Sequence, residues 1–245
     1  GVDMVDLDAA TDRGIPVFNT PHYCLEEVAT HTMSLILACE RRVCQYDDDV
    51  TSGGWDYESR APIRRFSSKT VGVVGCGDIG LEVVQRLKGF DVDVVGYDPY
   101  VSESEMRRHG IRKADFESLC ADADVITVHT PLTESTRHLI DAAAFDSMET
   151  GTTLVNAARG GIVDQAALHD AIEDGTVAYA GLDVLEHEPP EDDRLLGFDN
   201  VVITPHAAWY SEDALAELQR QAGENVAAFL DGDVPDHVVN RSVLE

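Results

Sequence analysis

Four residues that could take part in chemistry each follow an apolar run in the second half of the chain. Arg159 comes three residues after "TTLVN", and Asp183 directly after "AYAGL". Glu188 lies five residues further on, and His206 follows "VVITP". Arginine grips a carboxylate through two parallel hydrogen bonds, and histidine exchanges protons near neutral pH. Such a set suits the interconversion of a 2-keto acid and a 2-hydroxy acid.

Each residue has an expected role in that reaction. Arg159 would hold the substrate carboxylate and polarise the adjacent carbonyl. His206 would give a proton to the carbonyl oxygen as hydride reaches the carbon, and remove it in the reverse direction. Glu188 would stabilise the charged imidazole and fix its orientation, and Asp183 would accept a hydrogen bond from a nicotinamide carboxamide. Taken singly, the arginine reads as a surface ion-pair partner and the histidine as a turn residue; their occurrence at successive strand ends favours catalysis.

The elements that must position these residues alternate between apolar runs and helical patterns, which is typical of an α/β fold with a parallel sheet. Strands are expected at 70–75, 93–97, 124–129, 152–156, 178–183 and 201–204. Helices are expected near 79–89, 103–109, 115–121, 142–148 and 164–174. Ligands of open parallel sheets lie beyond the carboxyl ends of the strands, so one doubly wound sheet would bring the reactive residues to one edge.

The rest of the chain is expected to form a helix at 5–12, a strand at 15–20, a long helix at 25–42 and an irregular arm at 46–69. A last helix is expected at about 211–231, with Ser211 as its N-cap. We predict that residues 22–206 form a dinucleotide-binding domain, and that 1–21 with 207–245 form part of a second, smaller domain. These two pieces total about 60 residues, which would make a marginal core.

The segment "TVGVVGCGDIGLEVVQRL" carries a dinucleotide fingerprint, Gly75-x-Gly77-x-x-Gly80, between a strand and a helix. The first glycine makes a tight turn, the second lets the backbone approach a pyrophosphate, and the third allows close packing of helix and strand. Asp98 follows 18 residues beyond Gly80, at the end of the next strand. A carboxylate there binds both ribose hydroxyls and repels a 2′-phosphate, so NAD is favoured over NADP. The alternative is a structural glycine turn with a chance aspartate.

Charge and composition narrow the classes of function. The 245 residues hold 46 Asp and Glu against 18 Lys and Arg, a formal charge of −28. This surface repels phosphates, which disfavours nucleic-acid binding. Because the acidic excess is spread along the whole chain, we favour adaptation to high salt over a merely solvated acidic face.

Three further patterns argue against other kinds of site. The five cysteines contain no Cys-x-x-Cys pair, and we interpret them as small buried residues in a reducing, cytoplasmic compartment. The longest apolar run, 33–39, is too short to span a bilayer, so no membrane partner is expected. The acidic stretch 186–193, "EHEPPEDD", contains prolines and lacks ligand spacing, so no metal site is predicted.

Six blocks of sequence resemble, in order, the motifs of the D-isomer-specific 2-hydroxyacid dehydrogenases. They are "GVDMVDLDAATDRGIPVFNTP", "VGVVGCGDIG", "VITVHTPLTESTRHLI", "LVNAARGGIVDQAALHDAI", "GLDVLEHEPP" and "ITPHAAWYSE". The resemblance covers nearly the whole chain. The ending "TPHAAWYSEDA" is most similar to the C-terminal-binding-protein branch of the family and its microbial relatives.

The resemblance implies a Rossmann domain with a flavodoxin-like substrate domain, NAD as cofactor and a homodimer formed through the long helix and the arm. It assigns catalysis to Arg159, Glu188 and His206, with His206 as proton donor, and places Trp209 beside the keto-acid substrate with Arg159 and His206. The positions that it assigns to NAD binding are Gly75, Gly77, Asp78, Ile79, Gly80, Asp98, Thr130, Pro131, Ala157, Ala158, Arg159, Asp183, His206 and Ala208.

One departure from the family leaves three hypotheses open. The resemblance implies that family members carry further strands and helices of the substrate domain before Gly1, including a glycine-rich segment that grips the substrate carboxylate, so this domain is expected to be truncated. The first hypothesis is an NAD-dependent D-2-hydroxyacid dehydrogenase. The second is an NAD-binding regulatory protein of corepressor type, and the third is an inactive truncated paralogue. Trp209 favours an apolar substrate side chain over a phosphorylated one.

Overall fold

The computed structural model describes residues 1–190, 194–235 and 237–244. The chain divides into two compact units. One unit consists of Gly1–Glu27 with Trp209–Glu245, and the other of Val28–Ala208. Within the described ranges, no helix combines the length and the apolar character that crossing a bilayer requires.

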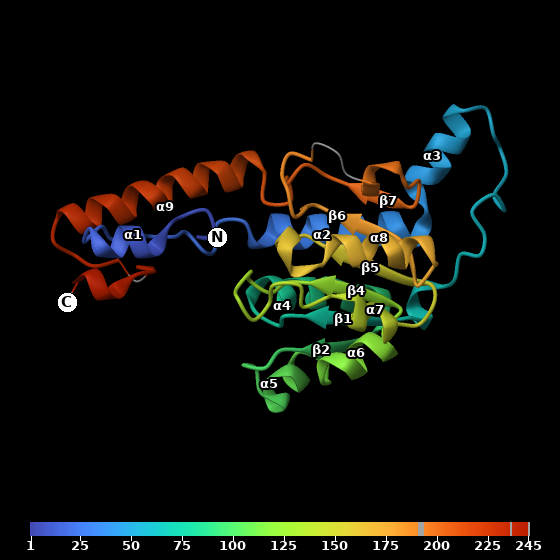
Figure 1. Ribbon diagram of the computed structural model, residues 1–245, viewed down its shortest axis with the longest axis horizontal. Helices are drawn as coiled ribbons and strands as arrows, with labels where there is room; N and C mark the ends of the chain where they lie inside the picture. Colours follow the sequence, from blue (N-terminus) through green and yellow to red (C-terminus); the bar gives the residue numbers. More distant parts are fainter. Residues whose placement is uncertain (191–193, 236, 245) are drawn as a thin grey trace. The chain divides into compact units, whose positions relative to one another are not determined.

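The larger unit is built on one parallel sheet, shown in Figure 1. Along the sheet the strands stand in the order β3-β2-β1-β4-β5-β6-β7, the doubly wound arrangement of a Rossmann domain. Their bounds are β1 Thr70–Val74, β2 Asp93–Tyr97, β3 Arg112–Lys113, β4 Val125–Val128, β5 Thr152–Asn156, β6 Val177–Leu182 and β7 Val201–Ile203. β4 and β5 are buried along their whole length because helices cover both faces of the sheet.

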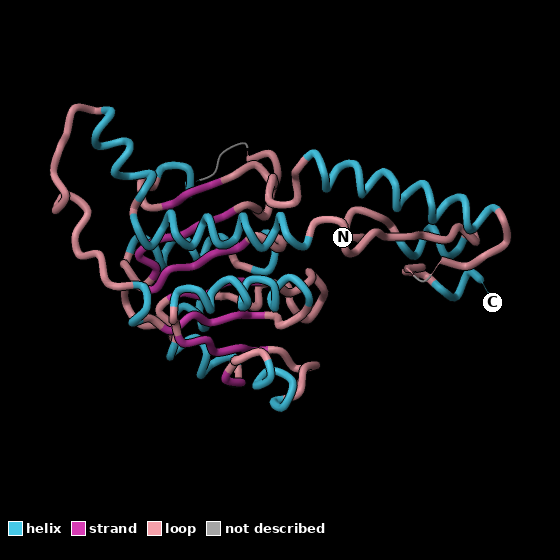
Figure 2. Tube along the Cα trace, turned by 180° about the vertical axis from the view of Figure 1, so that it is seen from behind, coloured by secondary structure: helices cyan, strands magenta, loops and turns pink. Residues whose placement is uncertain are grey.

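The helices of this unit form two groups, one on each face of the sheet. On one face, α2 (Leu25–Arg41), α4 (Asp78–Leu87) and α5 (Glu103–Arg108) share a core that includes Ile36, Leu87 and Met106. On the other face, α6 (Phe116–Asp122), α7 (Ala142–Asp146) and α8 (Gln165–Glu173) share a second core. Figure 1 labels the helices of both groups beside the strands, and Figure 2 gives the same arrangement from behind.

Several helices begin where the sequence supplies a capping side chain. The carboxylates of Asp115, Asp141 and Asp164 accept hydrogen bonds from backbone amides in the first turns of α6, α7 and α8. The bonds from Ser118 lower the pKa of Asp115 below its usual range. Ser211 caps α9 (Glu212–Leu230) in the same way, by accepting from the amide of Ala214, which confirms that cap. The starts of α6, α7, α8 and α9 are therefore fixed by side chains of the sequence.

A buried ion pair joins α2 to the segment that leads into β1. The Glu40 carboxylate is 2.6 Å from Lys69 Nζ, and it accepts a hydrogen bond of 2.8 Å from Thr153 Oγ1. The side chains of Glu40 and Lys69 are 2% and 10% exposed. A carboxylate this deeply buried needs both partners, since charge without compensation is costly in the interior. The three residues fix α2 against the middle of the sheet.

The smaller unit holds α1 (Leu7–Asp12), α9 and a 3-10 turn, Arg241–Leu244. The strand predicted at 15–20 is wrong. Phe18 forms only an isolated bridge with Val238, and its ring packs on Phe229 at 5.4 Å between centroids. Pro16 supplies no amide to a ladder, so the segment cannot extend this pairing.

The larger unit differs from expectation in three local places. The arm predicted as irregular at 46–69 begins with a helix, α3 (Val43–Thr51), which follows Arg42 in the left-handed region at φ 57°. The helix was not predicted because three consecutive aspartates, 47–49, interrupt the apolar pattern of a helix. The two-residue strand β3 was missed because Arg112 and Lys113 lack the apolar pattern of a strand. Cys44 is exposed, so the interpretation of the cysteines as buried is wrong for this one and right for the other four.

Candidate active site

The turn that follows β7 carries His206 in an uncommon backbone conformation. Its φ is +53°, in the left-handed region, and its amide donates to the backbone oxygens of Asp183 at 2.8 Å and Thr204 at 3.0 Å. A residue other than glycine adopts this conformation at a cost of roughly 1–3 kcal/mol, which the surroundings must offset. The turn is therefore held in place by its neighbours.

Asp183 supplies most of that restraint. Its side chain is 1% exposed. Oδ1 accepts from the hydroxyl of Thr204 at 2.5 Å and from the amide of Ala207 at 2.9 Å, and Oδ2 accepts from the amide of Ala208 at 2.9 Å. Its expected partner, a nicotinamide carboxamide, stays a prediction. The main observed contacts of this carboxylate are with the turn that carries His206.

Glu188 contacts His206 directly. Its Oε2 lies 2.7 Å from His206 Nδ1, and its Oε1 accepts from the amide of Leu185 at 2.9 Å. The side chains of His206 and Glu188 are 40% and 36% exposed. Because an ionised carboxylate only accepts hydrogen bonds, Nδ1 carries a hydrogen. Nε2 is then the ring nitrogen that can exchange a proton with another molecule. Two residues earlier, Glu186 is 2.5 Å from His138 Nε2, which ties the same loop to the chain after β4.

Arg159 stands on a turn that Asn156 holds closed. Asn156 is 1% exposed and ends β5. Its Nδ2 donates to the backbone oxygen of Arg159 at 2.9 Å, and its Oδ1 accepts from the amide of Ala158 at 3.0 Å. Arg159 Nη1 donates to the Ala158 oxygen at 2.7 Å. We did not predict the role of Asn156 from the sequence, although an asparagine that ends a strand before a turn was the signal for it.

Gly160 brings the Arg159 turn against the loop that carries Glu188. A Cβ added at Gly160 would lie 2.0 Å from the backbone carbon and oxygen of Leu185, and 2.5 Å from the amide nitrogen of Glu186. No side chain fits there, so the two backbones touch. The sheet edge thus brings together Arg159, Asp183, Glu188 and His206 through contacts of their turns.

The glycine turn between β1 and α4 has a separate physical reason for each glycine. Gly75 has φ +95°, and a Cβ there would lie 2.8 Å from the backbone of His129. A Cβ at Gly80 would lie 2.2 Å from the Gly75 oxygen. Gly77 has a negative φ, and nothing in the protein lies within 4 Å of an added Cβ. The fold itself requires Gly75 and Gly80, whereas the space beside Gly77 is open to a ligand.

Polar groups at the ends of β2 and β4 border this turn. Asp98 accepts from the amides of Cys76 at 3.0 Å and Tyr100 at 2.8 Å. The Oγ1 of Thr130 is buried, and among the described residues it has no hydrogen-bond partner. Burial lowers the pKa of the neighbouring His129 to about 4, so this ring is neutral. Buried polar atoms are normally paired, which makes Thr130 a candidate for contact with a bound molecule.

The remaining predicted cofactor positions lie on the same turns. Asp78 and Ile79 begin α4, directly after Gly77, and Pro131 follows Thr130. Ala157 is buried beside Ala158 on the Arg159 turn, and Ala208 is buried at the end of the His206 turn. A cavity of about 640 Å³ is lined by residues between Tyr97 and Asp122, and Asp98 is among them. None of the catalytic candidates lines it.

Trp209 belongs to the other unit of the chain. Its indole packs on Tyr23 at 6.2 Å and on Tyr210 at 5.7 Å between ring centroids. Its expected place beside a substrate stays a prediction. The acidic stretch 186–193 extends into residues 191–193, which lie outside the described residues.

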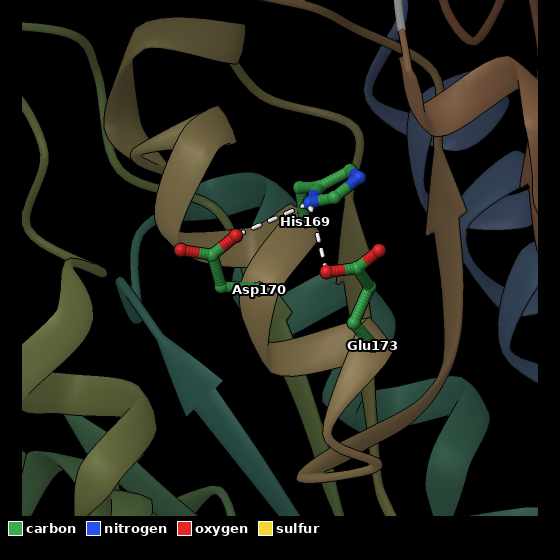
Figure 3. A group of neighbouring side chains, drawn as sticks. All are labelled: His169, Asp170 and Glu173. Carbon is green, nitrogen blue, oxygen red and sulfur yellow. Dashed lines mark hydrogen bonds and ion pairs between the residues drawn. The ribbon is translucent and has the colours of Figure 1, made fainter.

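Three side chains on α8 form a group with metal-ligating atoms, shown in Figure 3. His169 Nδ1 lies 3.2 Å from Asp170 Oδ1 and 3.9 Å from Glu173 Oε2, and both carboxylates are largely exposed. The His169 ring packs on Phe198. One imidazole between two exposed carboxylates is accounted for as ordinary ion pairing on a helix surface.

Comparisons with known proteins identify the family to which this chain, with its Rossmann-type sheet, belongs. Residues 33–208 match the family described as "D-isomer specific 2-hydroxyacid dehydrogenase, NAD binding domain". The chain therefore belongs to the D-isomer specific 2-hydroxyacid dehydrogenase family, and its larger unit carries the family's NAD-binding domain.

Individual relatives span a range of named activities. The D-3-phosphoglycerate dehydrogenase of Archaeoglobus fulgidus is 42% identical over all of this chain but only 46% of its own length. The glyoxylate reductase of Korarchaeum cryptofilum is 38% identical over all of this chain and 75% of its own length. A crystal structure of D-lactate dehydrogenase from Aquifex aeolicus, complexed with NAD and lactic acid, aligns with a TM-score of 0.90 at 32% identity, covering 98% of this chain and 78% of that one. The chain spans about half the length of the phosphoglycerate dehydrogenases that it matches.

The contact at Gly160 gives a first prediction. Gly160→Ala should lower the free energy of unfolding by about 1–3 kcal/mol, because the new methyl group must push the backbone of Leu185 away. Urea unfolding at a fixed KCl concentration measures this. The matched control is Gly197→Ala, where an added Cβ meets nothing within 4 Å, with an expected change within about 0.5 kcal/mol. Equal stability of the two variants would show that the two backbones are not in contact.

Proposed function

We propose that the chain belongs to an NAD-dependent oxidoreductase that interconverts a 2-keto acid and a D-2-hydroxy acid. The observation that carries this proposal is the 2.7 Å contact of His206 Nδ1 with Glu188, on a turn held in a strained conformation. Strain of this kind is retained where function needs a fixed side chain. Family membership and the NAD-complexed structural relative support the same conclusion.

The side chains would divide the chemical work among them. Arg159 holds the substrate carboxylate and polarises the adjacent carbonyl. His206 gives a proton from Nε2 to the carbonyl oxygen during reduction and takes it from the hydroxyl during oxidation. Glu188 keeps Nδ1 protonated as a donor, so that Nε2 is the atom that exchanges the proton, and it stabilises the charged ring.

NAD fits the residues at the glycine turn. The open space at Gly77 supports a pyrophosphate contact, and the Asp98 carboxylate supports a contact with the ribose hydroxyls. The buried Thr130 hydroxyl, which has no partner among the described residues, supports a contact on the adenosine side. Asp78, Ile79, Pro131, Ala157, Ala158 and Ala208 would line the same cofactor. When bound, NAD supplies or receives the hydride.

The role of His206 is tested by separating turnover from cofactor binding. His206→Ala should reduce kcat by about 100-fold or more, because proton transfer by a placed side chain contributes on this scale. The dissociation constant for NADH should stay within about threefold, since the ring's chemistry lies with the substrate. Turnover is followed by NADH oxidation in high KCl with pyruvate, glyoxylate, hydroxypyruvate, phosphohydroxypyruvate and bulkier keto acids, and binding by NADH fluorescence.

The control is His187→Ala, an exposed histidine of the same loop, which should leave both quantities unchanged. If His206→Ala abolishes NADH binding as well as turnover, the acid–base assignment fails. If the unsubstituted chain binds NADH and reduces none of these acids, the second hypothesis, an NAD-binding regulatory protein, gains over the first. An unsubstituted chain that neither binds NADH nor reduces a keto acid would indicate the third hypothesis, an inactive paralogue.

The open space at Gly77 gives a direct test of the cofactor site. Gly77→Ala should weaken NADH binding by about tenfold or more, because the methyl group enters the space proposed for the pyrophosphate. Its melting temperature should stay within about 2 °C of the parent, since the methyl meets no protein atom. Gly89→Ala, also free of neighbours within 4 Å, should leave both NADH binding and melting unchanged. Unaltered NADH affinity in Gly77→Ala would rule out a phosphate contact at this glycine.

The identity of the acid is proposed only as a class. Relatives are named for phosphoglycerate, glyoxylate and lactate chemistry, and these substrates differ in size and charge. The bulk of Trp209 led us to favour an apolar side chain. Faster turnover of phosphohydroxypyruvate than of every apolar keto acid in the same assays would refute this preference.

The expected homodimer also remains a proposal, supported by the exposed aromatic side chains of the arm. Trp55 and Tyr57 are 89% and 83% exposed. The segment that carries them is bonded to α3: the Tyr46 hydroxyl donates to the Tyr57 oxygen at 2.6 Å, and Arg60 Nε donates to Asp49 at 2.9 Å. An ordered arm that exposes large rings fits a surface covered by a second copy. Trp55→Ser with Tyr57→Ser should therefore shift the mass seen by light scattering from two chains toward one. Tyr100→Ser, equally exposed elsewhere, should not; a single-chain mass for the parent at every concentration would contradict the dimer.

Two proposals concern the surroundings of the protein. The five free cysteines support a reducing, cytoplasmic compartment. The charge of −28 supports a salt-rich one and disfavours nucleic-acid partners. Full stability in dilute buffer would count against adaptation to salt.

A further inference from the structure

His31 contacts two residues that support the turn carrying His206, namely Thr204 and Asp183. It stands on α2, and its side chain is 25% exposed. Its Nε2 lies 2.9 Å from Thr204 Oγ1 and 3.5 Å from Asp183 Oδ1. The Thr204 hydroxyl in turn lies 2.5 Å from Asp183 Oδ1. These three side chains form a continuous hydrogen-bonded chain from α2 to the carboxylate that holds the turn.

Counting hydrogens fixes the direction of this chain. The Asp183 carboxylate, already bonded to two backbone amides, only accepts. The single hydrogen of the Thr204 hydroxyl therefore points to Asp183, and its oxygen accepts from His31. His31 Nε2 must carry a hydrogen, whether the ring is neutral or charged. Without this donor the Thr204 hydroxyl would be free to turn away from Asp183 and donate elsewhere.

We propose that His31 is a positioning residue for the reaction, acting through Thr204 and Asp183 to hold the His206 turn in its left-handed conformation. The proposal rests on the proposed function, because it takes His206 as the proton donor. His31 touches neither the His206 ring nor Glu188 by any described hydrogen bond or ion pair, so its effect passes through the carboxylate.

The restraint matters because the conformation of this turn determines where the His206 ring lies. Four of the described hydrogen bonds from Thr204, His206, Ala207 and Ala208 end on Asp183, through its carboxylate or its backbone oxygen. The turn therefore depends on the position of one buried residue. Hydrogen bonds in such a chain polarise one another, so that a donor at its far end strengthens the bond from Thr204 to Asp183. A slightly misplaced imidazole lowers turnover even when the substrate and cofactor still bind.

The experiment compares His31→Leu with His31→Gln. Glutamine places an amide N–H near the position of Nε2 and restores the donor, whereas leucine fills similar space without one. We expect kcat to fall about tenfold in His31→Leu and to stay within about threefold of the parent in His31→Gln, with KM and the NADH dissociation constant little changed. Thr30→Leu, an exposed neighbour on α2, is the matched control and should leave kcat unchanged.

A second readout needs no turnover. In the NMR spectrum of the unsubstituted chain, His31 should show a proton on Nε2. The amide signals of Ala207 and Ala208 should move in His31→Leu and return in His31→Gln. The proposal fails if these amides do not respond, or if leucine and glutamine reduce kcat equally. A parent chain without turnover would refute the proposed function alone, since the NMR comparison still tests whether His31 holds the turn.

Discussion

The arrangement of the catalytic candidates depends on one buried carboxylate. Asp183 has lost its water, and each of its oxygens is paired with groups from the chain between Thr204 and Ala208. An ionised group in the interior requires such pairing, and the requirement acts in both directions. The carboxylate is tolerated because the turn surrounds it, and the turn keeps an unfavourable φ at His206 because the carboxylate needs its amides. The local cost at His206 is thereby offset by the satisfaction of a charge that would otherwise be buried alone.

The same edge of the sheet is assembled by close contact between backbones. Gly160 lets the turn after β5 touch the loop after β6, and Gly75 and Gly80 let the turn after β1 touch the chain after β4 and itself. At each place a methyl group would lie within 3 Å of backbone atoms, which cannot move aside cheaply. Loops at the carboxyl ends of four strands thus behave as one packed layer. Residues supplied from distant parts of the chain keep fixed positions because their supporting turns are interlocked.

The pattern of apolar residues and the residues that end each run predicted six of the seven described strands of the sheet and the turns that carry the site residues; only the edge strand β3 was missed. The runs at 70–75, 152–156 and 201–204 contain β1, β5 and β7, and Gly75, Asn156 and Pro205 mark where they end. The sequence could not reveal which polar side chains support those turns. His31 lies on a helix expected only to pack, and its partners Thr204 and Asp183 are about 150 to 170 residues away along the chain. The segment 15–20 failed for a related reason, since an apolar run becomes a strand only if a partner can pair along it. Such pairings are set by the tertiary fold.

The negative charge of the molecule makes it harder for this edge of the sheet to bind anions. A formal charge of −28 opposes the approach of the two anionic groups that the proposed function requires, a pyrophosphate and a keto-acid carboxylate. Salt screens that repulsion beyond roughly 8 Å at physiological ionic strength, so only nearby groups decide binding. In the proposed site, the amides at the start of α4 and the guanidinium of Arg159 would be such groups, because each acts over hydrogen-bond distances. Carboxylates at the same edge are engaged: Asp183 by its turn, Glu188 by His206, and Asp98 by two amides. An acidic protein can offer a site to anions when the acids inside that site are already occupied by donors of the chain itself.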